Sequence, residues 1–383
     1  MGKKTIIFNQ LIEGIDRKNF NNLVETHEAN RYVKSFDAWS HLLTLLYAQL
    51  SNQESLRTIE MNFGQVIRKE KLNNVASPKR VTLSEANRRR PVNFFQDICT
   101  NLINEVQKIK KHKNEAKEML HLMDSTPIPL TGRGLGWAAK TQRITGLKAH
   151  FIYDTSSESP TYFSITSAKV NDIIEGQNIK LEPNQTLVFD RAYYDFAWWD
   201  KITKIGSTFV TRPKSTLAYK KVKERKALGK NIQSDETIAL TSEKGRKYKG
   251  PLRLIKASIE VRGIKKCISI ITNNLMLSAK KVVAIYKKRW DIELFFKWIK
   301  QNLKIKKYFS QNENAIKIQI ITAIIAYLLV KIMQIRSQSG ISMRRLITFL
   351  KNHLSCKIKY KYGKKSVKIS LPRLAVSNQV GLI

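Results

Sequence analysis

Four polar side chains in the last third of the chain have a spacing that could bring them to one site: Tyr286, Arg289, Glu293 and Lys300. In an α-helix, which turns by about 100° per residue, these positions fall within roughly 60° of one another. The sequence therefore predicts one helix from Ser278 to about Lys304 that carries all four on one face. Its other directions are mostly apolar, which predicts a largely buried helix. The apolar residues are Ile285, Trp290, Ile292, Leu294, Phe295, Phe296, Trp298 and Ile299.

A carboxylate on a buried helix is unfavourable unless a cation compensates its charge. One interpretation is that Arg289 and Lys300 neutralise Glu293 through internal ion pairs. The other is that a metal ion is the partner of Glu293, which leaves the two cations free to bind phosphate oxygens. The spacing alone leaves both interpretations open, because a charged stripe on a helix is commonly just a solvated face.

Two aspartates follow short apolar strands earlier in the chain. Asp124 ends the segment LHLMD, and Asp190 ends the segment TLVFD. Two further strands, 146–154 and 160–166, and a helix that begins near residue 171 lie between them. Three strands, a helix and a fourth strand are the order of a ribonuclease H-like fold, in which the first and fourth strands are neighbours. We therefore expect Asp124 and Asp190 to lie close together.

An acid at the end of a strand is often only a turn former or a helix cap, and this remains the alternative for both aspartates. Together with Glu293, however, they would form a site whose ligands are all oxygens, which suits magnesium or manganese. Two such ions can activate a nucleophilic oxygen and stabilise the leaving oxygen in an in-line phosphoryl displacement.

The composition favours a polyanionic partner. Lysine and arginine outnumber aspartate and glutamate 69 to 30 in 383 residues, which gives a formal net charge of +39. A hydrophobic content of 42% allows a sizeable core and two or three domains. Nucleic acid is the leading candidate partner, with salt-dependent binding. A membrane surface, or a basic protein without such a partner, is the alternative.

Cysteine and histidine give no sign of a structural metal or a disulfide framework. The three cysteines, Cys99, Cys267 and Cys356, are far apart, and no histidine has the close partner that zinc binding needs. We expect a reducing cytoplasm. The most apolar run, 320–330, is too short to span a bilayer, so the sequence predicts no membrane segment, and we see no export signal. A capping box of Ser310 and Glu313 predicts a buried helix there.

The first part of the chain is helical and contains basic clusters. Residues 38–50 form an apolar helix, and Ser51 with Glu54 predicts a capping box for a second helix, an arrangement compatible with a helix-turn-helix. A later cluster is predicted to contact phosphates; the alternative is a solvated basic surface. That cluster contains Lys79, Arg80, Arg88, Arg89 and Arg90.

The pattern predicts an α/β protein with three parts. Residues 1–112 are expected to be an all-α DNA-binding domain and residues 113–340 a ribonuclease H-like catalytic domain. Strand-like segments between residues 206 and 275 predict a β-rich insertion into that domain. Residues 341–383 form a basic C-terminal region.

The combined motifs resemble those of a known family. The string Tyr-two-Arg-three-Glu-six-Lys, the segment MDSTPI and the segment FDRAYYD resemble the signatures of the DDE transposases of the insertion-sequence-four group. Ala192 stands where relatives often have glycine. The resemblance implies that Asp124, Asp190 and Glu293 are catalytic and bind Mg²⁺ or Mn²⁺, as two ions. It also implies that Tyr286, Arg289 and Lys300 contact DNA.

The same resemblance implies cut-and-paste transposition of a bacterial insertion sequence. Metal-dependent cleavage at the element ends would be followed by strand transfer to target DNA, with terminal inverted repeats and target DNA as partners. Two protomers would assemble on two ends in the cytoplasm, at the nucleoid. One alternative is a metal-dependent endonuclease or junction resolvase on the same fold. A DNA-binding protein with an inactive site is a second alternative, against which the intact Asp124, Asp190 and Glu293 argue.

Overall fold

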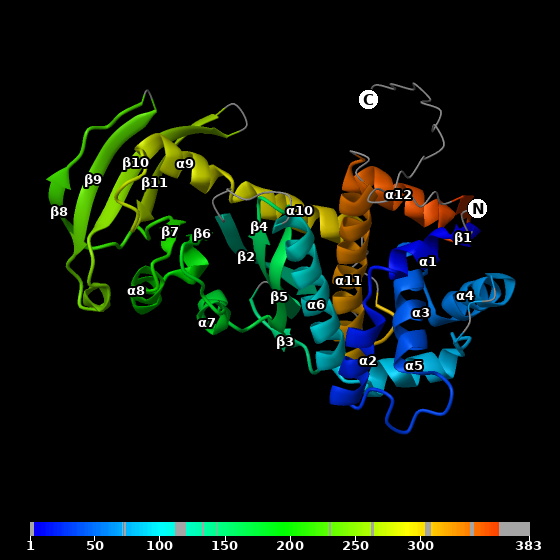
Figure 1. Cartoon of the computed structure of the whole chain (residues 1–383). Coiled ribbons are helices and arrows are strands. Elements are labelled where there is room, and N and C mark those ends of the chain that lie inside the picture. The colour runs from blue at the N-terminus through cyan, green and yellow to red at the C-terminus, as the bar shows by residue number, and fades with distance from the viewer. Residues whose placement is uncertain are drawn as a thin grey trace. The chain divides into compact units, whose positions relative to one another are not determined.

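The computed structural model describes residues 4–359 apart from 71, 73, 112–119, 132–133, 143, 230, 262–263, 303–307 and 338–340. These residues form two compact units (Figure 1). Unit 1 comprises residues 1–83 and 324–383, and unit 2 comprises residues 84–323. The division falls within helices α5 (Arg80–Arg89) and α11 (Glu313–Ser337). The predicted three-part division stays a prediction. Its first boundary, at residue 112, and the basic tail beyond residue 359 lie outside the described residues.

Unit 1 is built around helix α3 (Ala38–Leu50), at the predicted bounds. All of its residues except Trp39 and Gln49 are buried, and the Asp37 side chain caps it by accepting a hydrogen bond from the Ser40 amide at 2.7 Å. The helices around it are α1 (Ile7–Ile12), α2 (Arg17–Thr26), α4 (Leu56–Glu70) and α12 (Met343–His353). The N-terminal region is helical, as predicted, apart from a three-residue strand, β1 (Lys4–Ile6), which pairs with β12 (Lys357–Lys359).

The turn between α3 and α4 differs from the prediction. Ser51 does not cap α4: it ends α3, and its hydroxyl donates to the Tyr47 carbonyl at 2.7 Å. Asn52 then takes a positive φ of 63°, and Ser55 caps α4 by accepting from the Thr58 amide at 3.1 Å. Asparagine tolerates this left-handed conformation, which reverses the chain between the two helices.

Helix α11 is long and apolar enough to cross a membrane, but 83% of its apolar window is buried inside the protein. Such burial is typical of the core helix of a folded protein, as predicted for this segment. Its cap is Asn312, whose side-chain oxygen accepts from the Ala315 amide at 3.2 Å, rather than Ser310.

Unit 2 contains a ten-stranded sheet with the order β3-β4-β2-β6-β7-β11-β10-β9-β8, and β5 pairs with β4. The strands are β2 (Leu120–Pro129), β3 (Ala139–Lys140), β4 (Thr145–Asp154), β5 (Ser159–Ser167), β6 (Thr186–Val188), β7 (Thr208–Thr211), β8 (Tyr219–Glu224), β9 (Ile232–Leu240), β10 (Leu252–Val261) and β11 (Ile264–Thr272). The helices are α6 (Val92–Lys111), α7 (Asp172–Asn178), α8 (Phe196–Lys204), α9 (Ala279–Lys287) and α10 (Trp290–Asn302), with short 3₁₀ turns η1 (Arg191–Tyr193) and η2 (Lys244–Lys247).

Strand β2 continues through Asp124 instead of ending there. It pairs antiparallel with β4 from His121 to Pro129, although the sequence Ser-Thr-Pro predicts a break. Beyond Leu122, β2 has no pairing with β6 on its other side, so it behaves as an edge strand. Proline lacks an amide hydrogen, which is tolerated at a strand edge.

The predicted β-rich insertion is continuous with the central sheet. Its first predicted strand, β7, pairs parallel with β6 and so belongs to the core. Strands β8 to β11 then extend the same sheet through the antiparallel pairing of β11 with β7. Strand β8, rich in lysine, was not predicted from the sequence.

The two faces of the sheet carry different helices. On β4, Phe151 points to the face covered by α10, where its ring lies 5.4 Å from that of Phe295. The next residue, Ile152, belongs to the core on the opposite face together with Met123 and Trp199 of α8. Because side chains alternate along a strand, Asp124, which pairs with Phe151, lies on the α10 face.

Candidate active site

The strands that lead to Asp124 and Asp190 are neighbours in the sheet, as predicted. Strands β2 and β6 are parallel neighbours, with His121 opposite Leu187 and Leu122 opposite Val188. Continued by two residues, this register places Asp124 level with Asp190. The prediction that the first and fourth strands are adjacent is confirmed.

Asp190 follows β6 and also acts as a helix cap. Its Oδ1 accepts a hydrogen bond from the Ala192 amide at 2.8 Å and opens the turn η1. Ala192 is not among the residues with positive φ, so the turn does not require glycine here. Capping and the proposed chemistry are compatible, because the cap uses one of the two carboxylate oxygens.

The predicted single helix is two helices. Helix α9 ends at Lys287 and α10 begins at Trp290, and the amides of Lys288 and Arg289 bond carbonyls three residues back. These i−3 bonds replace the i−4 bonds of an α-helix and change the direction of the chain at the junction. Tyr286 and Glu293 therefore lie on different helices, with Arg289 between them.

Arg289 bridges two of the carboxylates. Its Nη2 lies 2.6 Å from Glu293 Oε1, and its Nη1 lies 3.5 Å from Asp124 Oδ2. The structure contains the ion pair between Arg289 and Glu293, which is the first of the two interpretations of Glu293. Lys300 is half-buried in α10, where it too interacts with other residues of the protein.

Burial and, after it, the neighbouring carboxylates oppose the ionisation of Asp124. Burial, and then the charge of Asp190, raise the pKa of Asp124 from 3.8 to about 7. Glu293 adds to the rise, whereas the Ser125 amide and Arg289 oppose it. One guanidinium does not neutralise this site, which retains excess negative charge when Asp124 is ionised.

The charge and donor types at this site fit a divalent cation. Asp124, Asp190 and Glu293 present only oxygen donors, as Mg²⁺ and Mn²⁺ prefer, and their repulsion is what a cation would relieve. Within the described ranges, no three Asp, Glu, His or Cys side chains are already arranged to hold a metal ion. The bridging position of Arg289 between Asp124 and Glu293 accounts for part of this.

Arg212 was missed by the sequence reasoning. It follows β7, the parallel neighbour of β6, and its charge lowers the pKa of Tyr286, a value raised overall by burial. Its Nε is buried and has no hydrogen-bond partner among the residues that the structure describes. Because the sequence pattern assigned residues 206–212 to the insertion, Arg212 was not expected near the carboxylates. Had β7 been recognised as a core strand, Arg212 would have been expected beside Asp190.

The basic cluster at the end of α5 is divided. Arg88 and Arg89 are exposed and both pair with Glu85, Arg88 at 2.8 Å. Arg90 is only 5% exposed, and its carbonyl accepts from the Asn314 side chain at 2.8 Å. A surface phosphate contact remains a prediction for Arg88 and Arg89. Arg90 departs from it, because its side chain is buried.

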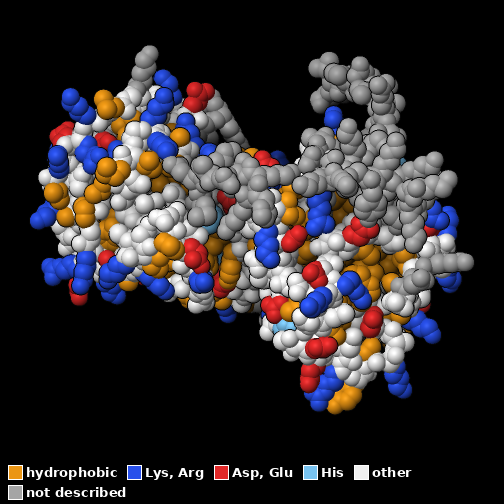
Figure 2. Space-filling model, in the orientation of Figure 1, with side chains coloured by type: hydrophobic (Ala, Val, Ile, Leu, Met, Phe, Trp, Pro, Cys, Tyr) orange, Lys and Arg blue, Asp and Glu red, His pale blue; other side chains and the backbone are white. Residues whose placement is uncertain are grey.

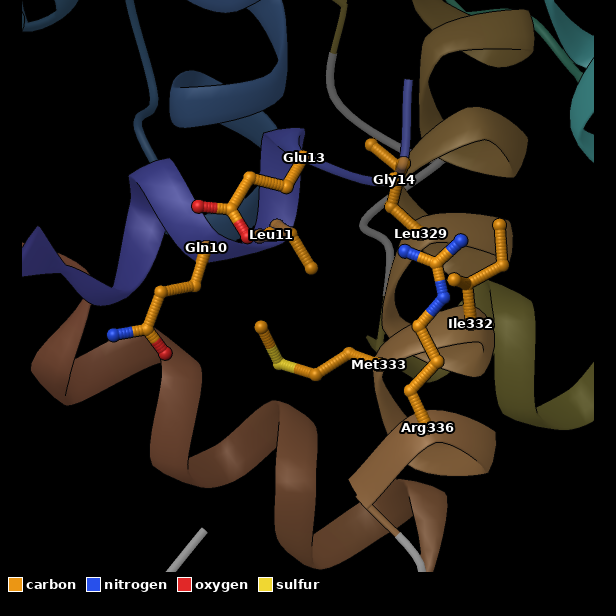
Figure 3. A pocket seen from close by; sticks show the side chains of 8 residues that line it. All are labelled: Gln10, Leu11, Glu13, Gly14, Leu329, Ile332, Met333 and Arg336. Carbon is orange, nitrogen blue, oxygen red and sulfur yellow. The ribbon is translucent and has the colours of Figure 1, made fainter. Parts of the chain in front are cut away.

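A cavity of about 40 Å³ lies in unit 1 between α1 and α11 (Figure 3). Glu13 and Arg336 border it with the apolar side chains of Leu329, Ile332 and Met333. Burial raises the pKa of Glu13, and Arg336 opposes that rise. None of the three carboxylates predicted for the catalytic site lines this cavity.

The family of the chain is shown by comparison with known proteins. The family described as "Transposase DDE domain" matches residues 115–329, more than half of the chain, and includes the three carboxylates and Arg289. The chain belongs to this family and is an enzyme that acts on DNA as a transposase. The family depends in general on divalent metal ions. A separate family, described only as a domain of unknown function, matches residues 3–74.

Three related proteins are also described as transposases. A transposase of Sinorhizobium fredii is 39% identical over 67% of this chain and 72% of its own length. Transposases for insertion sequence elements of Geobacillus stearothermophilus and Synechocystis are 26% and 29% identical, over 72% and 73% of this chain and 72% and 79% of their own lengths. A solved piggyBac transposase synaptic complex with hairpin DNA gives a TM-score of 0.46 at 11% identity, over 90% of this chain and 77% of that chain. A similarity of that level does not establish a shared fold.

Proposed function

We propose that this transposase moves an insertion sequence by cut-and-paste transposition and belongs to the insertion-sequence-four group. Its catalytic residues are Asp124, Asp190 and Glu293, on a ribonuclease H-like domain. The observation that carries the proposal is the placement of Asp124 on β2 and of Asp190 just after its parallel neighbour β6, with Arg289 bridging Asp124 and Glu293 of α10. The strand order β5-β4-β2-β6-β7, with α7 before β6, supports the fold assignment.

Bound Mg²⁺ or Mn²⁺, as two ions, supplies charge neutralisation and activation of oxygen for in-line displacement at phosphorus. The three half-buried carboxylates would hold the ions. A metal ion held by Asp124 and Glu293 would compensate the charge that Arg289 compensates in this structure, and Arg289 would then be available for another partner. Its planar guanidinium then binds phosphate oxygens beside the scissile bond, supported by Tyr286 and Lys300.

The reaction has two phosphoryl-transfer stages. Water first attacks the phosphorus at each element end, and the leaving oxygen becomes a free 3′ hydroxyl. That hydroxyl then attacks a phosphodiester of target DNA, so that one bond forms for each bond broken. Two protomers act on two element ends, in the bacterial cytoplasm at the nucleoid. Arg88, Arg89 and the exposed lysines of β8 add phosphate contacts. Figure 2 shows basic side chains along the outer edge of the insertion, where β8 is the edge strand.

Unit 1 supplies sequence recognition through α4. This helix follows the buried α3 in a helix-turn-helix order. Its exposed face contains residue types that bind base edges and phosphates, and no carboxylate lies among them. These exposed residues are Arg57, Met61, Asn62, Gln65, Arg68 and Lys69.

The test is cleavage and joining of element-end DNA in magnesium. Asp124→Asn, Asp190→Asn and Glu293→Gln should each lower the cleavage rate at least ~100-fold, with DNA affinity close to that of the wild type. Asp291→Asn is the matched control, because Asp291 is an exposed carboxylate two residues from Glu293. If one of these variants cleaved DNA as fast as Asp291→Asn, the substituted residue would not belong to the catalytic site. Cleavage by the wild type without any strand joining would favour an endonuclease or resolvase instead.

A further inference from the structure

A buried ion pair lies inside the β-rich insertion, outside the carboxylate site. Arg253 on β10 is 2% exposed and Asp235 on β9 is 3% exposed. Arg253 Nε and Nη2 donate to the two Asp235 carboxylate oxygens at 2.7 and 2.6 Å. Two parallel hydrogen bonds of this kind fix the orientation of both groups.

This pair extends to the turn that joins β11 to α9. Arg253 Nη1 donates to the carbonyl oxygen of Leu277. Arg225, which follows β8, donates from Nη2 to the carbonyl oxygen of Leu275 at 2.7 Å, and its Nε lies 3.7 Å from Asp235 Oδ1. One buried carboxylate thus orients two guanidinium groups, and each holds one backbone carbonyl of the turn.

The turn is ordered by its own side chains as well. Asn274 Oδ1 accepts from the amides of Met276 and Leu277 at 3.0 Å each, and Ser278 caps α9 by accepting from the Lys281 amide at 3.3 Å. The start of α9 is therefore tied to strands β8, β9 and β10 through three side chains of the insertion.

Stability alone does not explain this arrangement. Removing two charges from water is unfavourable, and an apolar pair of similar volume often gives equal or greater stability. Apolar side chains, however, offer no donors to the carbonyl oxygens of Leu275 and Leu277. What the ion pair adds is a fixed position for the turn.

That position matters because α9 leads directly into the active site. Its nine residues span about 13 Å, and Tyr286 lies in its last turn. A tilt of about 5° at the start of α9 would move its far end by roughly 1 Å. A displacement of that size at reacting groups can lower a rate about 100-fold.

We propose that Asp235, Arg253 and Arg225 are positioning residues for the transposase site. The insertion sheet holds α9, and through it Arg289 and Glu293, at the distance from Asp124 and Asp190 that cleavage requires. This inference rests on the proposed function, because it takes Glu293 as a member of the site.

The first test uses Arg225→Met, with Lys226→Met as its matched control. Arg225 is partly exposed, so the variant should fold, and it loses the bond to the Leu275 carbonyl. Lys226 is the exposed next residue, and its replacement removes one charge at the same place without touching the turn. Both variants should bind DNA equally. Arg225→Met should cleave at least tenfold more slowly at saturating DNA and need more Mg²⁺ for half-maximal cleavage. Equal cleavage rates and Mg²⁺ requirements in the two variants would overturn the proposal.

The second test is the double variant Asp235→Leu/Arg253→Met. It removes the buried pair without leaving an unpaired charge, so its melting temperature should stay near that of the wild type. Its cleavage rate should still fall at least tenfold. A folded double variant with the wild-type rate would assign the pair a role in stability only, and if this variant does not fold, Arg225→Met decides the matter.

These outcomes are separate from failure of the proposed function. The wild type must cleave and join element ends in the same assay, and Glu293→Gln must be inactive. If those results hold and Arg225→Met still behaves like Lys226→Met, only the positioning role is lost.

Discussion

The fold works strongly against the ionisation of Asp124. In a solvated chain its carboxyl has a pKa of 3.8, whereas burial and the charges of Asp190 and Glu293 raise the pKa to about 7 in the folded protein. Above pH 7 the folded chain therefore holds an unfavourable charge. As pH falls from 7 toward 3.8, folded Asp124 takes up a proton that the unfolded chain does not bind, and the unfavourable contribution disappears.

Asp124→Asn should thus stabilise the protein in a pH-dependent way. In chelator, its melting temperature should exceed that of the wild type at pH 8, with a gain in unfolding free energy on the order of a few kcal/mol at most. The gain should shrink as pH approaches 4. Thermal melting across this range is the measurement, and a difference that does not vary with pH would contradict the assigned pKa.

Strands β2 and β4 determine the position of Asp124, and Gly146 of β4 packs directly against the backbone of β2. A Cβ at Gly146 would overlap the Ile128 carbonyl oxygen, which belongs to the backbone of β2 and has no room to move. Gly136, in the preceding loop, has no atom within 4 Å of the corresponding position.

Gly146→Ala should therefore lower the unfolding free energy of unit 2 by roughly 1–3 kcal/mol, the usual range for overpacking. For a unit of this size the melting temperature should fall by several degrees. Gly136→Ala is the control and should melt like the wild type. Equal melting of the two variants would show that β2 and β4 can separate without cost at this point.

At the scale of the whole molecule, the formal charge of +39 gives affinity for any DNA, whereas selectivity must come from a particular surface. Arg57→Ala/Arg68→Ala on α4 should lower affinity for the element end more than for random duplex, by roughly 5- to 150-fold for lost base contacts. Lys18→Ala/Lys34→Ala removes the same charge elsewhere on unit 1 and should weaken both complexes equally. Equal loss for both duplexes in the α4 variant would exclude α4 as the reading helix.

Much of the catalytic region could be predicted because its signals are local. The strands around Asp124 and Asp190 alternate or run apolar, and their order determined which strands are neighbours. The helix break at Lys288 and Arg289 could not be predicted, because the residues there are good helix formers and the break depends on tertiary contacts. The burial of Arg90 and the placement of Arg212 also depend on partners distant in sequence.

The strand pairings between segments distant in sequence could not be predicted either. In the sequence, β7 resembles the other strands of the insertion, and only its pairing with β6 shows that it belongs to the central sheet. The three residues of β1 pair only with β12, at the other end of the described chain. Short segments of three or four residues carry too little periodicity to be assigned without such neighbours.

The pairing of β1 with β12 also imposes an order of events during synthesis. Unit 2 is continuous in sequence, whereas unit 1 needs its first 83 residues and the segment from residue 324 onward. A nascent chain therefore has all the residues of the catalytic unit before the unit with α4 can close. Until the segment from residue 324 onward leaves the ribosome, unit 1 lacks part of its residues, whereas every residue of unit 2 has already been made.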